Sequence, residues 1–275
     1  MSVIITGHRG FIGGKLHTKL IENKESFIAY DVIDRKPFPV ILKEMEVDTI
    51  YHIGAMAGIG RCEQDRLLAL YLNVIHVQKW AEIALEKDAR IVFTSSAAAA
   101  KVIPTWYGHT KRMAESILLH YQRVNNLKVT IFRLPNIYGP GSLQKSSVIA
   151  SMCRDAIFNK GVYIHGTGNQ TRTFMHINDV VNLLLNFKRE GFYRVANGRL
   201  STINHLGKEI AEAFKVKTYK IPARSDSLLP AGTFDSIPKD LSADIKVHFS
   251  EGLQETIQYF KENCKEGGGA ISKMS

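Results

Sequence analysis

The sequence is poor in the residues that build disulfide, metal and membrane-spanning structures. Its 275 residues hold three cysteines, which lie far apart at positions 62, 153 and 264. That spacing fits neither a zinc site nor a redox pair, and the histidines are scattered too, so we expect no metal centre and a reduced, cytoplasmic protein. No run approaches the roughly 18 apolar residues of a membrane helix, and no signal peptide precedes the first apolar run. We therefore expect no membrane partner.

Acidic residues are outnumbered: 26 Asp and Glu stand against 36 Lys and Arg, which gives a formal net charge of +10. Basic proteins bind nucleic acids, but they also bind small polyanions such as dinucleotides and nucleotide sugars. The Lys and Arg residues here are scattered, without a basic arm, a finger motif or a basic helix. We therefore expect a small anionic ligand and no nucleic-acid partner.

Short apolar runs alternate with helical patterns in the first half of the chain. Runs typical of strands cover residues 3–6, 27–31, 48–55, 90–96 and 128–140, the last running into a Pro/Gly loop, and helical periodicity covers 15–22, 67–87 and 111–125. Strands that alternate with helices predict a parallel, doubly wound α/β sheet of the Rossmann type.

The pattern changes after Gly141. Helices are predicted over 146–158, 177–189, 203–214 and 250–263, the third with an Asn cap; a short strand followed by a polar loop covers 161–174, and another strand covers 192–198. We expect a first domain over 1–140, to which the chain returns at about 173–200, and a smaller C-terminal substrate-binding lobe, mainly 141–264. Residues 265–275 have no packing pattern and predict a flexible tail.

Three glycines mark the turn between the first strand and the first helix. Gly7, Gly10 and Gly13, in TGHRGFIG, permit a tight turn with close backbone approach, and the helix N-terminus offers N–H groups and a positive dipole end to a pyrophosphate. About 18 residues after Gly13 the second strand ends at Asp31, whose carboxylate is suited to accept hydrogen bonds from adenosine ribose hydroxyls. Together these features predict a nicotinamide dinucleotide in the 1–140 domain.

The choice between NAD and NADP depends on the same region. The charge of Asp31 would repel a ribose 2′-phosphate, which favours NAD. Arg9 in the glycine turn and Arg35 shortly after Asp31 could pair with that phosphate, which favours NADP. We expect NAD and keep NADP as the alternative.

Tyr107 and Lys111, in WYGHTKRMAE, are four residues apart and therefore share one helix face, about 6 Å apart along the axis. To act as a base near neutral pH, a tyrosine needs its pKa lowered by about 3 units from about 10. A neighbouring ammonium and a cationic nicotinamide ring stabilise the phenolate in that way. The strand-end hydroxyls of Ser95 and Ser96 are candidates for a third polar group.

These segments, in this order, resemble the extended short-chain dehydrogenase/reductase family, which contains the nucleotide-sugar epimerases and dehydratases. The resemblance runs from residue 2 to about 262 and rests on TGHRGFIG, VDTIYHIGA, Asn73, FTSSA, YGHTK, RLPNIYGP and GTGNQTRTFMHINDV. By position it implies a cofactor site at Gly7, Gly10, Phe11, Ile12, Gly13 and Asp31, with further contacts from Ala55, Asn73, Tyr107 and Lys111. It also implies a catalytic triad of Ser96, Tyr107 and Lys111, and a nucleotide-sugar site that includes Ser96, Asn136, Arg172 and Arg224.

The resemblance implies reversible oxidation of a nucleotide sugar. Tyr107 as phenolate would remove a hydroxyl proton while a hydride passes to the nicotinamide, and Ser96 would hydrogen-bond the reacting oxygen. The 4,6-dehydratases of the family place Asp-Glu after the strand-end hydroxyl, where this sequence has Ala97 and Ala98. The default interpretation is therefore a C4 epimerase, similar to UDP-glucose 4-epimerase, that works through a transient 4-keto sugar.

Three alternatives stay open. An NADPH-dependent epimerase-reductase of the GDP-fucose synthase type resembles the chain in its GHRG turn, although Ala97 or Ala98 and Ser147 occupy the neighbourhoods where that family has a Cys and a His. A UDP-glucuronate decarboxylase, or a dinucleotide-binding sensor without turnover, would have the same fold. Only 16 residues separate Asp31 from Asp48, so we also expect a sheet with one strand fewer than the family's.

Apolar faces on two predicted helices predict self-association. The first helix carries Leu67, Leu70, Val74 and Val77, and the second carries Met113, Ile117, Leu118 and Tyr121. In the family such helices pair two subunits in a four-helix contact, and the alternative is simple packing on the sheet. We expect a homodimer.

Overall fold

The computed structural model describes residues 2–32, 45–100, 105–142, 147–195, 200–223 and 245–264. The chain divides into two compact units, Met1–Leu134 with Val181–Val195, and Pro135–Val180 with Ala196–Ser275. The predicted tail, residues 265–275, lies outside the described residues.

A parallel sheet forms the centre of the first unit. Its strands among the described residues are β1 (Val3–Thr6), β2 (Phe27–Tyr30), β3 (Thr49–His52), β4 (Arg90–Ser96), β5 (Val129–Leu134) and β9 (Gly191–Arg194), in the order β2-β1-β3-β4-β5-β9. Every neighbouring pair is parallel. The doubly wound α/β fold that the sequence predicts is therefore confirmed. In the described part of the chain β2 and β9 are the two edge strands. A further strand beyond β2 would fall in residues 33–44, which lie outside the described residues.

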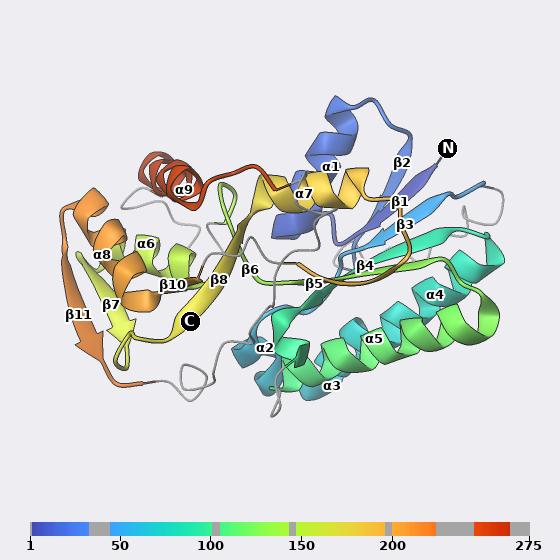
Figure 1. Cartoon of the computed structure of the whole chain (residues 1–275), viewed down its shortest axis with the longest axis horizontal. Coiled ribbons are helices and arrows are strands. Elements are labelled where there is room, and N and C mark those ends of the chain that lie inside the picture. Colours follow the sequence, from blue (N-terminus) through green and yellow to red (C-terminus); the bar gives the residue numbers. More distant parts are fainter. Residues whose placement is uncertain are drawn as a thin grey trace. The chain divides into compact units, whose positions relative to one another are not determined.

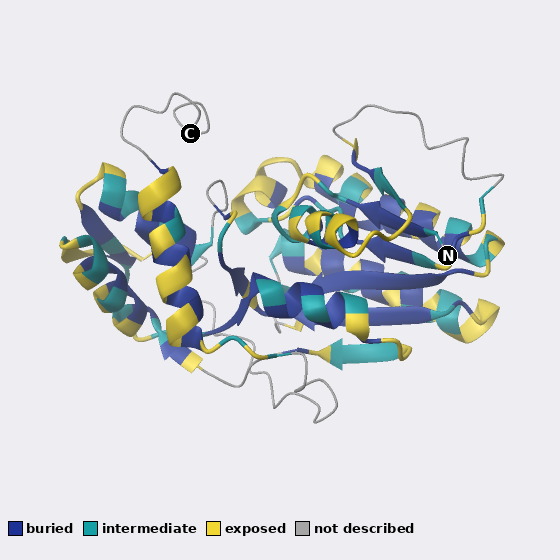
Figure 2. Cartoon of the chain, turned by 90° about the horizontal axis from the view of Figure 1, so that it is seen from above, coloured by how far each residue is buried: buried dark blue, intermediate teal, exposed yellow. Residues whose placement is uncertain are grey.

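Helices cover both faces of this sheet (Figure 1). One face carries α4 (His76–Glu86) and α5 (Trp106–Asn125), which lie side by side, and the other carries α1 (Phe11–Glu22). Trp80 of α4 and Leu118 of α5 pack with Phe93 and Ile131 of the sheet, all fully buried. Burying a large apolar side chain contributes about 1.5–3 kcal/mol to the free energy that stabilises the folded state. Figure 2 shows the centre of the sheet as buried and the outer faces of the helices as exposed.

Two helices of the first unit differ from the sequence prediction. The helix predicted over 67–87 is divided into α3 (Arg66–Leu70), a π-helical turn over Tyr71–Ile75 and α4. The helix predicted from residue 111 begins at Trp106, because the Thr105 hydroxyl accepts the N–H of Gly108 at 3.3 Å and caps it. The structure also has a short helix, α2 (Ile59–Gln64), that the sequence pattern did not indicate.

The second unit contains two small sheets. One holds β6 (Asn136–Tyr138), β8 (Thr171–His176) and β10 (Leu200–Thr202), and the other pairs β7 (Gly161–His165) with β11 (Lys217–Ile221). Its helices among the described residues are α6 (Val148–Phe158), α8 (Ile203–Phe214) and α9 (Phe249–Asn263), while α7 (Ile177–Asn186) begins in this unit and ends in the first. The buried faces of α6, α8 and α9 share one apolar core with Tyr138 and Phe174.

Two local predictions for this unit were wrong. Residues 171–174, predicted as the end of a polar loop, belong to β8, because β6 and β10 pair with this strand from either side. The cap of α8 is Thr202 and not an Asn: its hydroxyl accepts the N–H of His205 at 3.1 Å.

Candidate active site

The glycines of the turn after β1 are required by close backbone contacts. Gly7 has a φ of +74°, and the N–H of Gly10 donates to its carbonyl oxygen at 2.9 Å. A Cβ on Gly13 would lie 2.0 Å from that same oxygen, and a Cβ on Gly7 would lie 2.5 Å from the Cα of Gly54. Only glycine allows this packing between β1, α1 and the loop after β3.

The N-terminus of α1 opens from this turn. Gly10 is its N-cap residue, followed by Phe11 and Ile12, and within this described helix no side chain caps the end and the first turn holds no acidic residue. Helix ends of this kind present N–H groups and a positive partial charge to an anion. The turn is therefore a cradle that fits the pyrophosphate of a dinucleotide.

Asp31 lies beside this cradle and contacts its backbone. It follows β2, is 7% exposed, and its Oδ2 accepts the backbone N–H of Arg9 at 3.3 Å. Strands β2 and β3 flank β1 on opposite sides, so the chain reverses its strand order there. Ligands of doubly wound sheets bind at such a point. Arg9 is exposed, and Arg35 lies outside the described residues.

Asn73 supports the opposite side of the cradle. Its Oδ1 accepts the N–H of Met56 at 2.7 Å, and its Nδ2 donates to the carbonyl oxygen of Met56 at 3.1 Å and to the Thr110 hydroxyl at 3.0 Å. Its amide is thus engaged inside the protein, where it fixes the loop that carries Ala55. Asn73 lies within the π-helical turn over Tyr71–Ile75. Such turns occur frequently at functional sites.

Thr6 and His52 hold the ends of β1 and β3 together, and sequence reasoning missed both. The Thr6 hydroxyl accepts the N–H groups of Ile53 and Gly54 at 3.2 and 3.1 Å and lies 2.9 Å from His52 Nδ1. Since this hydroxyl already accepts twice, it donates to Nδ1, which is therefore unprotonated. Burial keeps the pKa of His52 well below 6.5, so the imidazole stays neutral. The signal in the sequence was a polar residue at each strand end.

The predicted catalytic side chains meet where β4 ends and α5 begins. Tyr107, half-buried, hydrogen-bonds with Ser96, whose Oγ also accepts the N–H of Ala98 at 3.2 Å. Lys111 is buried, and its Nζ donates to the carbonyl oxygen of Thr94 at 2.9 Å. The structure thus brings Ser96, Tyr107 and Lys111 together on two adjacent elements.

Burial opposes ionisation of both groups on α5. It raises the pKa of Tyr107 to about 12, although the hydrogen bond with Ser96 acts in the other direction. It lowers the pKa of Lys111 to about 8, although the charge of Glu115 raises it. Without a ligand, Tyr107 is therefore neutral at pH 7, and a further positive charge is needed to make it a base.

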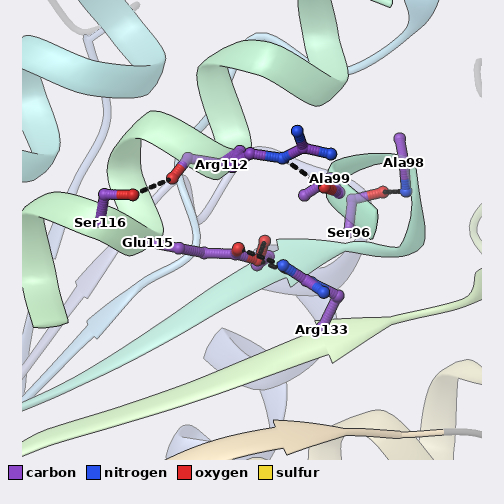
Figure 3. A network of polar contacts seen from close by, with 8 residues as sticks. Ser96, Ala98, Ala99, Arg112, Glu115, Ser116 and Arg133 are labelled. Atoms are coloured by element: carbon purple, nitrogen blue, oxygen red, sulfur yellow. Dashed lines mark hydrogen bonds and ion pairs between the residues drawn. The ribbon is translucent and has the colours of Figure 1, made fainter. Parts of the chain in front are cut away.

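Ser95 and Ser96, adjacent in sequence, have different partners. The Ser95 hydroxyl donates to Glu115, which also accepts Nε of Arg133 at 2.9 Å and a second hydrogen bond from Nη2. Figure 3 shows this network and the separate contact of Ser96 with Ala98. Ser96, and not Ser95, is therefore the hydroxyl that faces Tyr107.

Besides Ser96, the predicted substrate residues include Asn136 and Arg172, which lie in the second unit. Asn136, on β6, is in register with Phe174 of β8, two residues after Arg172. The Asn136 amide donates to the carbonyl oxygen of Thr173 at 3.1 Å, and Arg172 Nη1 donates to that of Thr171 at 2.8 Å. The two side chains thus come from neighbouring strands. Arg224 lies outside the described residues.

No group of His, Cys, Asp and Glu side chains in the described part of the chain is arranged to hold a metal ion. No helix there has both the length and the apolar character needed to cross a membrane.

The chain is similar to known proteins over most of its length. The sequence model of the NAD dependent epimerase/dehydratase family matches residues 3–191. UDP-glucuronic acid decarboxylase 1 of Arabidopsis thaliana is 23% identical, over 98% of this chain and 72% of its own.

Solved structures have the same fold. UDP-glucose 4-epimerase of Thermotoga maritima, solved with UDP-glucose, superposes with a TM-score of 0.86 at 23% identity, covering 96% of this chain and 100% of that one. The dTDP-glucose 4,6-dehydratase DesIV of Streptomyces venezuelae, solved with NAD bound, superposes with a TM-score of 0.82 at 21% identity. The match covers 96% of this chain and 98% of that one. These likenesses establish the fold.

Proposed function

Since this chain belongs to the NAD dependent epimerase/dehydratase family, we propose that it is an NAD-dependent nucleotide-sugar epimerase that acts at C4 through a transient 4-keto sugar. The observation that carries the proposal is the junction of β4 and α5. There Ser96, Tyr107 and Lys111 are assembled, while the next two residues, Ala97 and Ala98, have no acid or base. Oxidation at a sugar hydroxyl is thus supported without the groups that dehydration needs.

The glycine cradle and Asp31 would hold the dinucleotide. The pyrophosphate would lie on the N-terminus of α1, between Gly10 and Gly13, and the ribose hydroxyls would donate to Asp31. The acid in this position favours NAD over NADP. When bound, the nicotinamide would take a hydride from the sugar carbon and return it to the opposite face, so that only the configuration changes.

Tyr107 would take the proton of the sugar hydroxyl and later return it. The Ser96 hydroxyl would donate a hydrogen bond to the reacting oxygen and stabilise its developing charge. The Lys111 ammonium, anchored on Thr94, would favour the phenolate of Tyr107 one helical turn away. The nucleotide-sugar diphosphate would be held in the second unit, by Asn136, Arg172 and Arg224.

To test this, a panel of nucleotide sugars is incubated with the protein and either NAD or NADPH, and the masses of the products are measured by mass spectrometry. An isomer of unchanged mass with NAD supports the epimerase and identifies its sugar. Loss of water would overturn the epimerase in favour of a dehydratase. Binding of dinucleotide without turnover of any sugar would favour a sensor.

A second candidate is a UDP-glucuronate decarboxylase. It is favoured by the match over 98% of this chain to a curated decarboxylase. Loss of carbon dioxide from UDP-glucuronate, with NAD, would establish this activity in the same panel. A gain of two hydrogens with NADPH would establish instead an epimerase-reductase of the GDP-fucose synthase type, which the GHRG turn resembles.

We also propose a homodimer built on α3, the π-helical turn and α5. Leu67 is 81% exposed, and Leu68, Tyr71, Ile75 and Met113 are exposed as well. Val74, Val77 and Leu118, from the same predicted apolar faces, are buried in this chain. The exposed remainder is the apolar surface that a second copy would cover.

A further inference from the structure

Three residues of α5 spaced four apart, Tyr107, Lys111 and Glu115, contact three consecutive residues at the end of β4. Lys111 Nζ donates to the carbonyl oxygen of Thr94, Glu115 accepts the hydroxyl of Ser95, and Tyr107 hydrogen-bonds with the last residue of the strand. Residues four apart lie on one helix face. Glu115 therefore extends the row of predicted catalytic side chains by one turn, in contact with the same strand.

Arg133 fixes Glu115 from the neighbouring strand. It lies in β5 and donates through both Nε and Nη2 to the two carboxylate oxygens of Glu115 (Figure 3). The central carbon of its guanidinium lies over the ring of Phe192, 4.7 Å from the ring centroid. Glu115 and Arg133 are both buried. A buried carboxylate stays ionised only when such partners compensate its lost hydration. Two hydrogen bonds from the Arg133 guanidinium and one from the Ser95 hydroxyl compensate the lost hydration of the Glu115 carboxylate.

We propose that Glu115 is a positioning residue of the active site: its carboxylate, fixed by Ser95 and Arg133, keeps the Lys111 ammonium charged and directed at the end of β4. The proposal rests on the function proposed above for Tyr107 and Lys111. Without a countercharge in this buried place, the Lys111 ammonium would hold its proton less tightly, and a smaller charged fraction would be left to act on Tyr107.

The other titratable groups around Lys111 do not supply this countercharge. Burial raises the pKa of the Cys62 thiol on α2, so it stays protonated at neutral pH. His52, from β3, stays neutral, and Tyr107 is protonated without a ligand. Of the described groups that act on the Lys111 ammonium, Glu115 is thus the carboxylate, and its ion pair with Arg133 is the geometric evidence of its negative charge.

The test is a titration of the Lys111 ammonium by NMR on ligand-free protein with ¹³C,¹⁵N-labelled lysine, its signal assigned by its loss in Lys111→Arg. The wild-type midpoint is expected near 8. In Glu115→Gln we expect a midpoint lower by about one pH unit, which leaves the ammonium about tenfold less protonated above it. Glu82→Gln, which removes an exposed acid from α4, should leave the midpoint unchanged.

A second variant separates charge from folding. Glu115→Leu/Arg133→Met replaces the ion pair with apolar side chains of similar volume, a change that buried pairs tolerate well. This double variant should fold and still show the lowered midpoint of the Lys111 titration. If Glu115→Gln fails to fold, the double variant by itself tests the proposal. An unchanged midpoint in the variants that fold would overturn the proposal. Because the titration needs no substrate, its outcome is independent of whether any nucleotide sugar is turned over.

Discussion

The side-chain amide of Asn73 makes hydrogen bonds with both backbone polar groups of Met56, at 2.7 and 3.1 Å. It closes a loop between the π-helical turn and the end of β3, beside the glycine cradle. Both groups of Met56 are thereby satisfied by one side chain. The loop that carries Ala55 is thus fixed before any ligand binds.

We expect Asn73→Leu to lower the free energy of unfolding by about 2–4 kcal/mol, because it leaves buried backbone donors and acceptors without partners. Dinucleotide affinity should fall with it, since the loop is released. Urea unfolding and fluorescence titration with NAD measure the two effects. Asn125→Ala, at an exposed position on α5, is the matched control. A variant as stable as the wild type would show that the loop does not depend on Asn73.

Gly13→Ala tests the cradle. Its Cβ would lie 2.0 Å from the carbonyl oxygen of Gly7, and because the atoms that it meets belong to the backbone, the clash cannot be relieved by turning a side chain. We expect a loss of NAD binding and a destabilisation of about 1–3 kcal/mol. Gly60→Ala, on a helix and with nothing within 4 Å of its new Cβ, should fold and bind like the wild type. Equal NAD affinity in the two variants would place the dinucleotide elsewhere.

Asp31→Asn should shift preference from NAD toward NADP. The amide oxygen still accepts the N–H of Arg9, but the negative charge that repels a 2′-phosphate is gone. The ratio of the dissociation constants for NAD and NADP, measured by calorimetry, reports the change. Asp88→Asn removes the same charge from the exposed turn after α4 and should leave the ratio as it was. An unaltered ratio in Asp31→Asn would remove Asp31 from the ribose site.

Tyr107 should ionise at lower pH when oxidised cofactor is bound. Burial raises its pKa to about 12 in the free protein, and the positive nicotinamide ring stabilises the phenolate, so the shift is downward. Ultraviolet difference titration of the wild type minus Tyr107→Phe, with and without NAD, isolates this group. Tyr107→Phe should bind NAD normally and lose turnover by about 10²–10⁴-fold. Turnover at the wild-type rate would show that another group is the base.

Leu67→Glu should produce a monomer. The substitution puts a charge in the apolar surface proposed for the dimer, and because Leu67 is 81% exposed the subunit itself should fold normally. Light scattering on a size-exclusion column measures the mass of each form. A wild-type protein that is already monomeric would contradict the proposed interface.

Strand boundaries could be predicted best. β1 and β4 cover residues 3–6 and 90–96, as the apolar runs indicate, because a buried parallel strand reads as a continuous apolar segment. Helical spacing predicted that Tyr107 and Lys111 share one face, and the strand end offered Ser95 and Ser96 as candidates for a third group. The resemblance to the family selected Ser96. Their roles remain predictions.

The features that were missed depend on contacts between distant residues. The π-helical turn has the same apolar pattern as an α-helix, and its Asn73 accepts the N–H of Met56 and donates to the carbonyl oxygen of Met56, a residue distant in the sequence. β8 contains polar residues that read as a loop, and its pairing with β6 and β10 makes it a strand. Glu115 follows Lys111 by one turn, yet nothing local shows that Arg133, in another strand, would hold it.

The most direct test of the account follows the hydrogen at C4. A nucleotide sugar deuterated at C4 is incubated with the protein and NAD, and the product is analysed by mass spectrometry and NMR. We predict an isomer of unchanged mass, with its configuration inverted at C4 and the deuterium retained there, because the hydride is taken and returned within one site. Deuterium lost to solvent, or a product lighter by water or carbon dioxide, would contradict C4 epimerisation.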